Sequence, residues 1–221
     1  MAASNGLRLE PATLEDIPAI TDLWFAAFTD PDFRRLWPDT PGVRKWWDDT
    51  NRNDMLTKPF QKYLKVVDLS AVGADGRPRI VSYAKWDLAM IPDRGRRYLP
   101  WHEDMAIAEC DEFFEREDRE RMRVMGDEKH YCKGGPFFFF LCDFDICVAD
   151  GGKDLDSLAT HPEYQRRGAG SMLVKWGCDL ADQDGVKAYV DGSKDGAPLY
   201  ERFGFVDESV GDGMVASMAR R

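Results

Sequence analysis

The stretch HPEYQRRGAGS, residues 161–171, lies between a predicted strand from Asp154 to Thr160 and a predicted amphipathic helix. Gly168 and Gly170 lack a Cβ atom, so backbone amides there can approach an anion closely, and the N-terminus of the following helix carries partial positive charge. The helix is indicated by apolar residues at a spacing of about three to four, namely Met172, Leu173, Trp176 and Leu180. We therefore expect a phosphate-binding turn at the start of this helix.

Two well-known phosphate motifs do not fit this turn. The P-loop requires a Lys-Ser/Thr pair after its last glycine, whereas Ser171-Met172 follows here, and the dinucleotide fingerprint requires three glycines and a downstream carboxylate. An ordinary tight turn would explain the two glycines taken alone. The pattern Gln165-x-x-Gly168-x-Gly170 between strand and helix instead resembles the acyl-CoA pyrophosphate loop of the GNAT N-acetyltransferase superfamily.

The resemblance extends beyond the turn, over 158–170, then Lys175 to Cys178 and Leu199 to Phe205, and these runs are similar to a fungal-type branch of the superfamily. It implies an α/β fold, with a central mixed, mostly antiparallel twisted sheet of six to seven strands flanked by helices, and acetyl-CoA as acyl donor. Because the resemblance covers only the half from Asp154 to Phe205, it says little about the acceptor.

The same resemblance implies which residues hold the donor. They form the strand exit, the turn, the helix start and a later helix: Leu158, Ala159, Thr160, Gln165, Arg166, Arg167, Gly168, Ala169, Gly170, Ser171, Ser193, Tyr200 and Phe203. Backbone amides near Leu158 and Thr160 are expected to bind the pantetheine arm and the acetyl carbonyl. Ser193 matches a position that often touches the cofactor, although capping of the next helix alone would explain it.

Acetyl transfer to an amine needs a neutral amine, stabilisation of the carbonyl oxygen and a proton for the departing thiolate. The resemblance places Tyr200 near the thioester sulfur, and a tyrosine with a pKa of about 10 can donate a proton at neutral pH. We expect it to be the general acid. The alternative is a tyrosine that merely packs against the core.

Several groups are candidates for the general base. Strand alternation puts Asp154, Asp156 and Leu158 on one face and Leu155, Ser157 and Ala159 on the other. The two aspartates are the candidate bases, Asp154 because histone-acetylating members carry a glutamate at that position. Alternatively, these aspartates are solvated carboxylates at a strand edge without a catalytic role, and the enzyme takes free amine from solution, as many members of the superfamily do. His161 is a third candidate base, although a His-Pro pair at the strand exit more often shapes the turn.

Composition restricts the class of protein. The 221 residues suit a single domain spanning 1–221, and a net charge of -10 argues against nucleic-acid binding and favours cationic amines. Five cysteines without a C-x-x-C pair suggest neither disulfides nor a metal site. No stretch of about 18 apolar residues and no N-terminal signal pattern occurs, so we expect a cytoplasmic protein without a membrane partner.

The remaining elements follow from periodicity and turn residues. They are a strand at Leu7 to Glu10, a helix capped by Thr13-x-x-Asp16, a second helix from Val43 onward, a hairpin of 65–72 and 80–86, a strand at Val186 to Asp191, a helix from Ser193 to Phe203 stopped by Gly204, and a last strand at 214–218. Short apolar runs at 137–141 and 143–148 could also be strands.

Between the hairpin and the glycine turn, residues 87–135 are expected to form a helical insertion. Residues 102–129 carry 11 acidic and 5 basic side chains. Pairs at i,i+4 spacing, Glu112/Arg116, Glu115/Arg119 and Glu117/Arg121, favour an exposed, solvated helix. Such a helix could serve as a lid over the substrate.

These observations favour an acetyl-CoA-dependent N-acetyltransferase that acts on a primary amine of a small molecule, by direct attack in a ternary complex. The alternatives are an acetyltransferase for protein lysines or N-termini, and a catalytically silent acyl-CoA sensor. Either a monomer or a homodimer is compatible with the sequence.

Overall fold

The computed structural model describes residues 6–88, 97–125, 153–211 and 213–221, with Lys153 and Asp154 described by their backbone. Its strands are β1 Leu7–Pro11, β2 Gln61–Val72, β3 Pro78–Asp87, β4 Lys153–Thr160, β5 Ala188–Ser193, β6 Val206–Asp207 and β7 Val215–Arg220. Its helices are α1 Ile17–Ala27, α2 Pro31–Leu36, α3 Pro41–Thr57, α4 Ile107–Met125, α5 Ala169–Asp184 and α6 Ala197–Glu201, with short 3-10 turns η1 Leu14–Asp16 and η2 Pro162–Tyr164.

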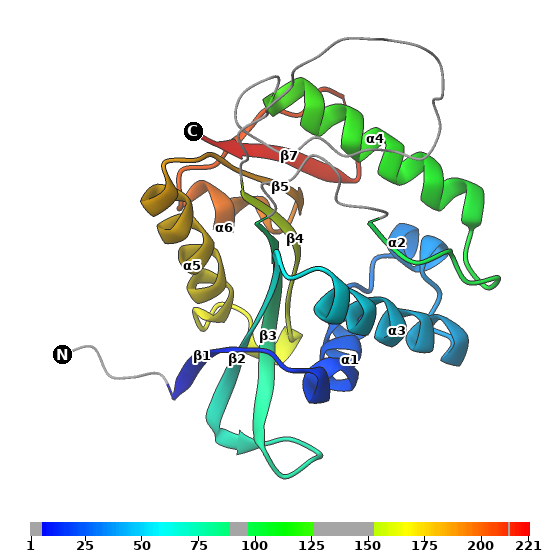
Figure 1. Cartoon of the computed structure of the whole chain (residues 1–221), viewed down its shortest axis with the longest axis vertical. Helices are drawn as coiled ribbons and strands as arrows, with labels where there is room; N and C mark the ends of the chain where they lie inside the picture. The colour runs from blue at the N-terminus through cyan, green and yellow to red at the C-terminus, as the bar shows by residue number, and fades with distance from the viewer. Residues whose placement is uncertain (1–5, 89–96, 126–152, 212) are drawn as a thin grey trace.

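The seven strands form one sheet in the order β1-β2-β3-β4-β5-β7-β6. Within the described part of the chain, β4 and β5 pair in parallel and the other neighbours pair antiparallel. Figure 1 shows α5 and α6 on one face of the sheet and α1 and α3 on the other, with α4 running along β7. The predicted mixed, mostly antiparallel sheet flanked by helices is confirmed.

The two larger hydrophobic cores of the described residues lie one on each face of the sheet. On the α5 face, Trp86 is fully buried, and a Cβ atom added to Gly177 would lie 2.1 Å from its ring. The helix backbone therefore rests directly on the indole, which only glycine permits. On the opposite face, the core is built largely from aromatic rings of α1, α2, α3 and α4, including Trp24, Trp37 and Trp47.

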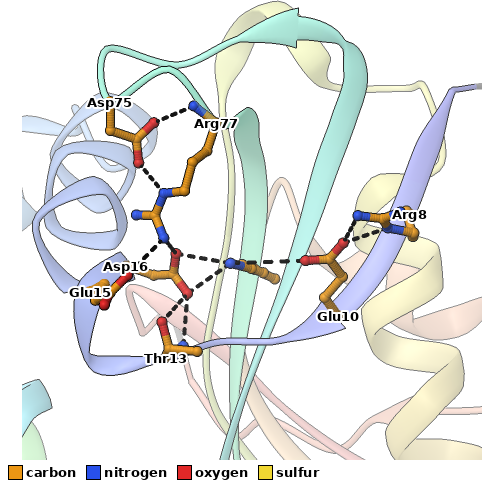
Figure 2. Close-up of polar contacts among 8 residues, drawn as sticks. Arg8, Glu10, Thr13, Glu15, Asp16, Asp75 and Arg77 are labelled. Atoms are coloured by element: carbon orange, nitrogen blue, oxygen red, sulfur yellow. Dashed lines mark hydrogen bonds and ion pairs between the residues drawn. The ribbon is translucent and has the colours of Figure 1, made fainter.

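A buried carboxylate ties the N-terminal segment to the sheet. Figure 2 shows Asp16 between Thr13 and Arg77, and the Thr13 N–H donates to Asp16 Oδ2 at 2.7 Å while Lys65 Nζ on β2 lies 2.8 Å away. Burial alone would raise the pKa of Asp16, but the hydrogen bonds from Lys65 and Thr13 outweigh it and leave the pKa below its ordinary value. The predicted Thr13-x-x-Asp16 contact is present, and η1 leads into α1.

Most predicted elements occur with wider bounds than the sequence indicated. The helix from Val43 begins at Pro41, the hairpin strands are β2 and β3, and the tail strand is β7. Gly204 has the left-handed φ of 84° expected of a helix stop. The runs at 137–141 and 143–148 lie outside the described residues, as do 89–96 and 126–135 of the expected insertion.

Two local predictions were wrong. Ser193 does not cap α6, because β5 continues through it and the helix starts at Ala197; its hydroxyl accepts from the Gly196 N–H at 3.1 Å instead. The charged helix α4 is not solvated all round, because it packs on β5 and β7 and buries Glu117 and Arg121. In the described residues, no helix has both the length and the apolar character needed to cross a membrane.

Candidate active site

The sheet opens between β4 and β5. The two strands pair at three positions, from Lys153 opposite Ala188 to Leu155 opposite Val190, and no further pair joins the described residues of these strands. Beyond this point their edges line a cleft that also reaches α4 and the aromatic core of α1 to α3. An opening of this kind leaves backbone N–H and C=O groups of both strands available to a ligand.

A bulge in β4 sits at the point where the strands part. Lys85 pairs with Ser157 but the next residue, Trp86, pairs with Leu155, so Asp156 is the extra residue. The bulge overturns the predicted strict alternation. Leu155 packs in the α5-side core, whereas the Ser157 hydroxyl lies 3.0 Å from the Tyr83 hydroxyl on the opposite face.

Asp156 is held by two cations. Its carboxylate oxygens lie 2.8 Å from Lys85 Nζ and 2.5 Å from the Arg97 guanidinium, and Lys85 also contacts Asp54 of α3 at 2.7 Å. Burial by itself would raise the pKa of Asp156, but the charges of Arg97 and Lys85 hold it well below its usual range. A carboxylate so stabilised is a weak proton acceptor, which argues against Asp156 as the base.

For Asp154, the structure describes only the backbone. It pairs with Asp87 on β3 and Tyr189 on β5, immediately before the strands separate. Its catalytic role therefore stays a prediction. His161 shapes the turn, because its Nδ1 atom accepts from the Glu163 N–H at 3.3 Å and its Nε2 atom lies 3.0 Å from Arg79.

The glycine turn leads into α5 as predicted. Gly168 is the N-cap residue with φ of 93°, and no side chain caps the helix. A Cβ atom on Gly170 would lie 3.2 Å from Leu199 of α6 and 3.5 Å from the Thr160 hydroxyl, so the helix start is pressed against the exit of β4. The uncapped N–H groups of the first turn and the positive helix end form a chemically suitable cradle for a pyrophosphate.

Some side chains around the turn are exposed to solvent, and others form ion pairs or hydrogen bonds. Gln165 and Arg166 are exposed. Arg167 pairs with Asp68 at 3.3 Å and lies over a tyrosine ring. Sequence reasoning missed Arg202, whose guanidinium donates to the Ser171 hydroxyl at 3.2 Å and thereby adds a positive charge at the helix start. This arginine lies within the run Leu199 to Phe205, but the run gives no signal of the contact.

Tyr200 lies in the cleft with Leu158 and Ser193. Its ring crosses β5 at Gly192, where an added Cβ atom would lie 2.6 Å from the ring. Burial raises the pKa of the phenol, so the proton stays on the oxygen at neutral pH. The structure thus brings together Tyr200, Leu158 and Ser193 in the cleft.

The remaining predicted donor-binding residues are placed elsewhere. Ala159 packs in the aromatic core, and Phe203 packs against the α5-side core and does not line the cleft. The Thr160 hydroxyl lies 2.8 Å from the Ser82 hydroxyl. Ala169 is buried at the start of α5, where only its backbone could contact a donor.

A pair of carboxyl groups in the cleft was also missed. Glu117 of α4 and Asp191 of β5 share a hydrogen bond, and both line the cleft. Asp191 Oδ1 further accepts from the Tyr189 hydroxyl at 2.6 Å and the Ser217 hydroxyl at 3.1 Å. Burial, followed for Glu117 by the negative charge of Asp191, raises the pKa of both carboxyl groups.

Part of the sequence is similar to known proteins. The model of the acetyltransferase (GNAT) domain matches residues 137–207. An acetyltransferase from Stachybotrys chartarum is 41% identical over 56 residues, a match that spans 25% of this chain and 24% of that relative.

Two solved structures show the same fold over nearly the whole chain. One, histone acetyltransferase HPA2 and related acetyltransferase from Corynebacterium glutamicum, has a TM-score of 0.51 at 20% identity and covers 97% of this chain and 94% of that one. The other, an N-acetyltransferase from Thermoplasma acidophilum in complex with coenzyme A, has a TM-score of 0.54 at 10% identity, with coverage of 97% and 98%.

The sheet that opens between two parallel strands, with an uncapped helix at the opening, defines a GNAT-type fold. The domain match over residues 137–207 makes this part of the chain similar to the GNAT acetyltransferase domain. The fungal relative fits the branch that the sequence motifs indicated.

Proposed function

We propose that the protein is an acetyl-CoA-dependent N-acetyltransferase that acylates a primary amine of a small molecule. The observation that carries the proposal is the meeting of the strand opening at Asp156 and the Tyr200 ring in one cleft, together with the uncapped start of α5 against the exit of β4. Acetyl-CoA supplies the thioester carbonyl and the thiolate leaving group. The family relationship supports this choice of donor.

The proposed roles follow from the positions of the groups. The first-turn amides of α5, with Arg202 nearby, hold the pyrophosphate. The free edges of β4 and β5 around Leu158 and Ser193 hold the pantetheine amides in an extended strand-like arrangement. Tyr200 donates its phenolic proton to the leaving thiolate, and Asp154 remains a candidate base.

A small-molecule acceptor agrees with the size of the cleft better than a polypeptide does. The cavity has a volume of about 150 Å³ and is walled in large part by aromatic rings. An engineered cavity of about that volume admits benzene. An acceptor of this size can be sequestered from water during attack, which strengthens the electrostatic contacts made in the site.

Free-thiol release from acetyl-CoA tests the proposal when measured against a panel of small amines and basic peptides. Turnover of a free amine, with loss of turnover in Tyr200→Phe, supports both the activity and the proton donor. Turnover confined to peptides would instead identify a protein acetyltransferase. Acetyl-CoA binding without turnover of any acceptor would identify a sensor.

A further inference from the structure

The acceptor end of the cleft is divided into an apolar part and a polar part. The apolar part, here called the aromatic chamber, consists of rings from α1, α2 and α4 and from the residues that directly follow α1 and α2, namely Trp24, Phe28, Phe33, Trp37, Phe113 and Phe114. Several of these rings meet edge to face, as Trp37 and Phe113 do at 5.7 Å. The polar part is the hydrogen-bonded carboxyl pair of Glu117 and Asp191.

The two parts adjoin each other on one helix face. Phe113 and Phe114 precede Glu117 by four and three residues, the separations at which side chains on a helix are neighbours. Asp191 and Gly192 are consecutive on β5, so the carboxyl pair and the Tyr200 ring lie on opposite faces of this strand, beside the opening between β4 and β5 that connects the two faces. A ligand can therefore reach from the chamber, past the pair, toward Tyr200.

The carboxylates that line the cleft differ in how far cations neutralise them, and the pair of Glu117 and Asp191 is less neutralised than Asp156. Asp156 is neutralised by Lys85 and Arg97. The cations nearest the pair have other carboxylates as well: Arg121 donates to Asp118 at 3.2 Å, and Arg97 is bound to Asp156. Arg116 lies 3.5 Å from Glu117 Oε1, but its side chain is 42% exposed, so water screens its charge. Two hydrogen-bonded carboxyl groups of this kind share a proton and still carry one negative charge.

We propose that the acceptor is a primary amine joined by a short chain to an aromatic or comparably flat apolar group, with its ammonium at Glu117 and Asp191 and its ring in the aromatic chamber. The proposal rests on the proposed acetyltransferase function and names its substrate class. In the reaction, an N–H bond of the ammonium breaks, and the proton passes to a carboxylate oxygen of the pair. The nitrogen lone pair then forms a bond to the acetyl carbonyl carbon, the C–S bond breaks, and the coenzyme A thiolate takes the phenolic proton of Tyr200, whose hydroxyl is restored by the second proton lost from the nitrogen.

Linear polyamines are disfavoured by the same geometry. All six side chains of the aromatic chamber are rings without a formal charge, so a second ammonium would lie there without a carboxylate partner. Removing such a charge from water is costly unless it is paired. Aromatic rings give a flat apolar group edge-to-face contacts as well as area burial.

The test compares 2-phenylethylamine, n-butylamine and spermidine as acceptors by initial rates, and measures binding of each to the protein saturated with coenzyme A by calorimetry. We expect 2-phenylethylamine to have a kcat/KM at least about 10-fold above that of n-butylamine, the order expected for filling an apolar pocket. Glu117→Gln is expected to raise its KM and weaken its binding by about 10- to 100-fold, the range for a lost hydrogen bond to a charged group.

Matched variants keep the result interpretable. Glu115→Gln lies on the exposed side of the same helix, where its side chain is 72% exposed beside Arg119, and it should leave KM unchanged. Phe113→Leu should reduce the preference for the aromatic amine while acetyl-CoA binding stays constant. If Glu117→Gln disturbs the packing of α4, Asp191→Asn provides a second test, because it changes the member of the carboxyl pair that lies on β5.

The outcomes separate this proposal from the proposed function. Preference for spermidine or n-butylamine, or a Glu117→Gln variant with unchanged KM and binding, would overturn the substrate class while acetyl transfer itself stands. Tight binding of 2-phenylethylamine that depends on Glu117, with no acetyl transfer to any amine, would support the pocket and refute the enzyme. Absence of amine binding would overturn the proposal.

Discussion

Replacing Asp156 by asparagine should lower the free energy of unfolding, because this residue has a structural rather than a catalytic role. Its carboxylate is buried with Lys85, and their side chains are 7% and 3% exposed. Removing one partner of a buried ion pair typically costs about 3–5 kcal/mol, because the remaining charge is left uncompensated. Lys85 keeps Asp54 at 2.7 Å, so we expect the lower end, about 3 kcal/mol.

In a domain of this size, that loss corresponds to a fall in Tm of roughly 6–12 °C. The pH dependence has a definite sign. The folded-state pKa of Asp156 is depressed, so its contribution is present above the unfolded-state value of about 3.9 and is lost as the pH falls toward the folded-state value. The difference between wild type and variant should be constant from about pH 5 to 7 and shrink below about pH 4.

Urea unfolding followed by tryptophan fluorescence measures this difference directly. Asp179→Asn is the matched control, because Asp179 forms an exposed i,i+4 pair with Lys175 at 2.6 Å, and such pairs contribute at most about 0.5 kcal/mol. A structural role for Asp156 would be wrong if Asp156→Asn were as stable as this control and instead lost turnover with a shifted pH profile. Asp156 would then be a catalytic base.

Three further predictions concern other parts of the fold. Gly177→Ala should destabilise the protein by about 1–3 kcal/mol, because the new Cβ atom would overlap the Trp86 ring; a Tm equal to that of wild type would contradict the packing described. Tyr200→Phe should lower kcat by about 100-fold, with acetyl-CoA binding unchanged by calorimetry, whereas unchanged kcat would remove the proton-donor role. Cys110 and Cys178, whose pKa values burial raises to about 11, should resist iodoacetamide in the native protein at pH 7.5 and react only after unfolding, as peptide mass spectrometry would show.

The donor half of the fold could be predicted because local sequence determines it. A glycine turn without a capping side chain, followed by apolar residues at helical spacing, specifies the start of α5 with little help from distant residues. The hairpin and the tail strand could also be predicted, from runs of β-branched and aromatic residues. Their bounds differ from those predicted because pairing extends each strand until a neighbour ends.

The acceptor half depends on long-range contacts that periodicity does not reveal. Glu117 formed part of a regular i,i+4 charge pattern, and only the packing of α4 on β5 turns it inward toward Asp191. Likewise, the sequence placed Asp156 correctly on β4, but it did not reveal the bulge at this residue or its contact with Arg97. These two features make Asp156 an ion-paired carboxylate. A sequence pattern identifies a carboxylate; its partners come from other elements.

Acetyl transfer to an amine can be observed by incubating the purified protein with acetyl-CoA and 2-phenylethylamine and detecting the product by mass spectrometry. We expect an N-acetylated amine in amounts equal to the free thiol released, at a rate that depends on both substrates. Thiol release without acetylated amine, or no acetylated product with this or any other amine at saturating acetyl-CoA, would contradict it.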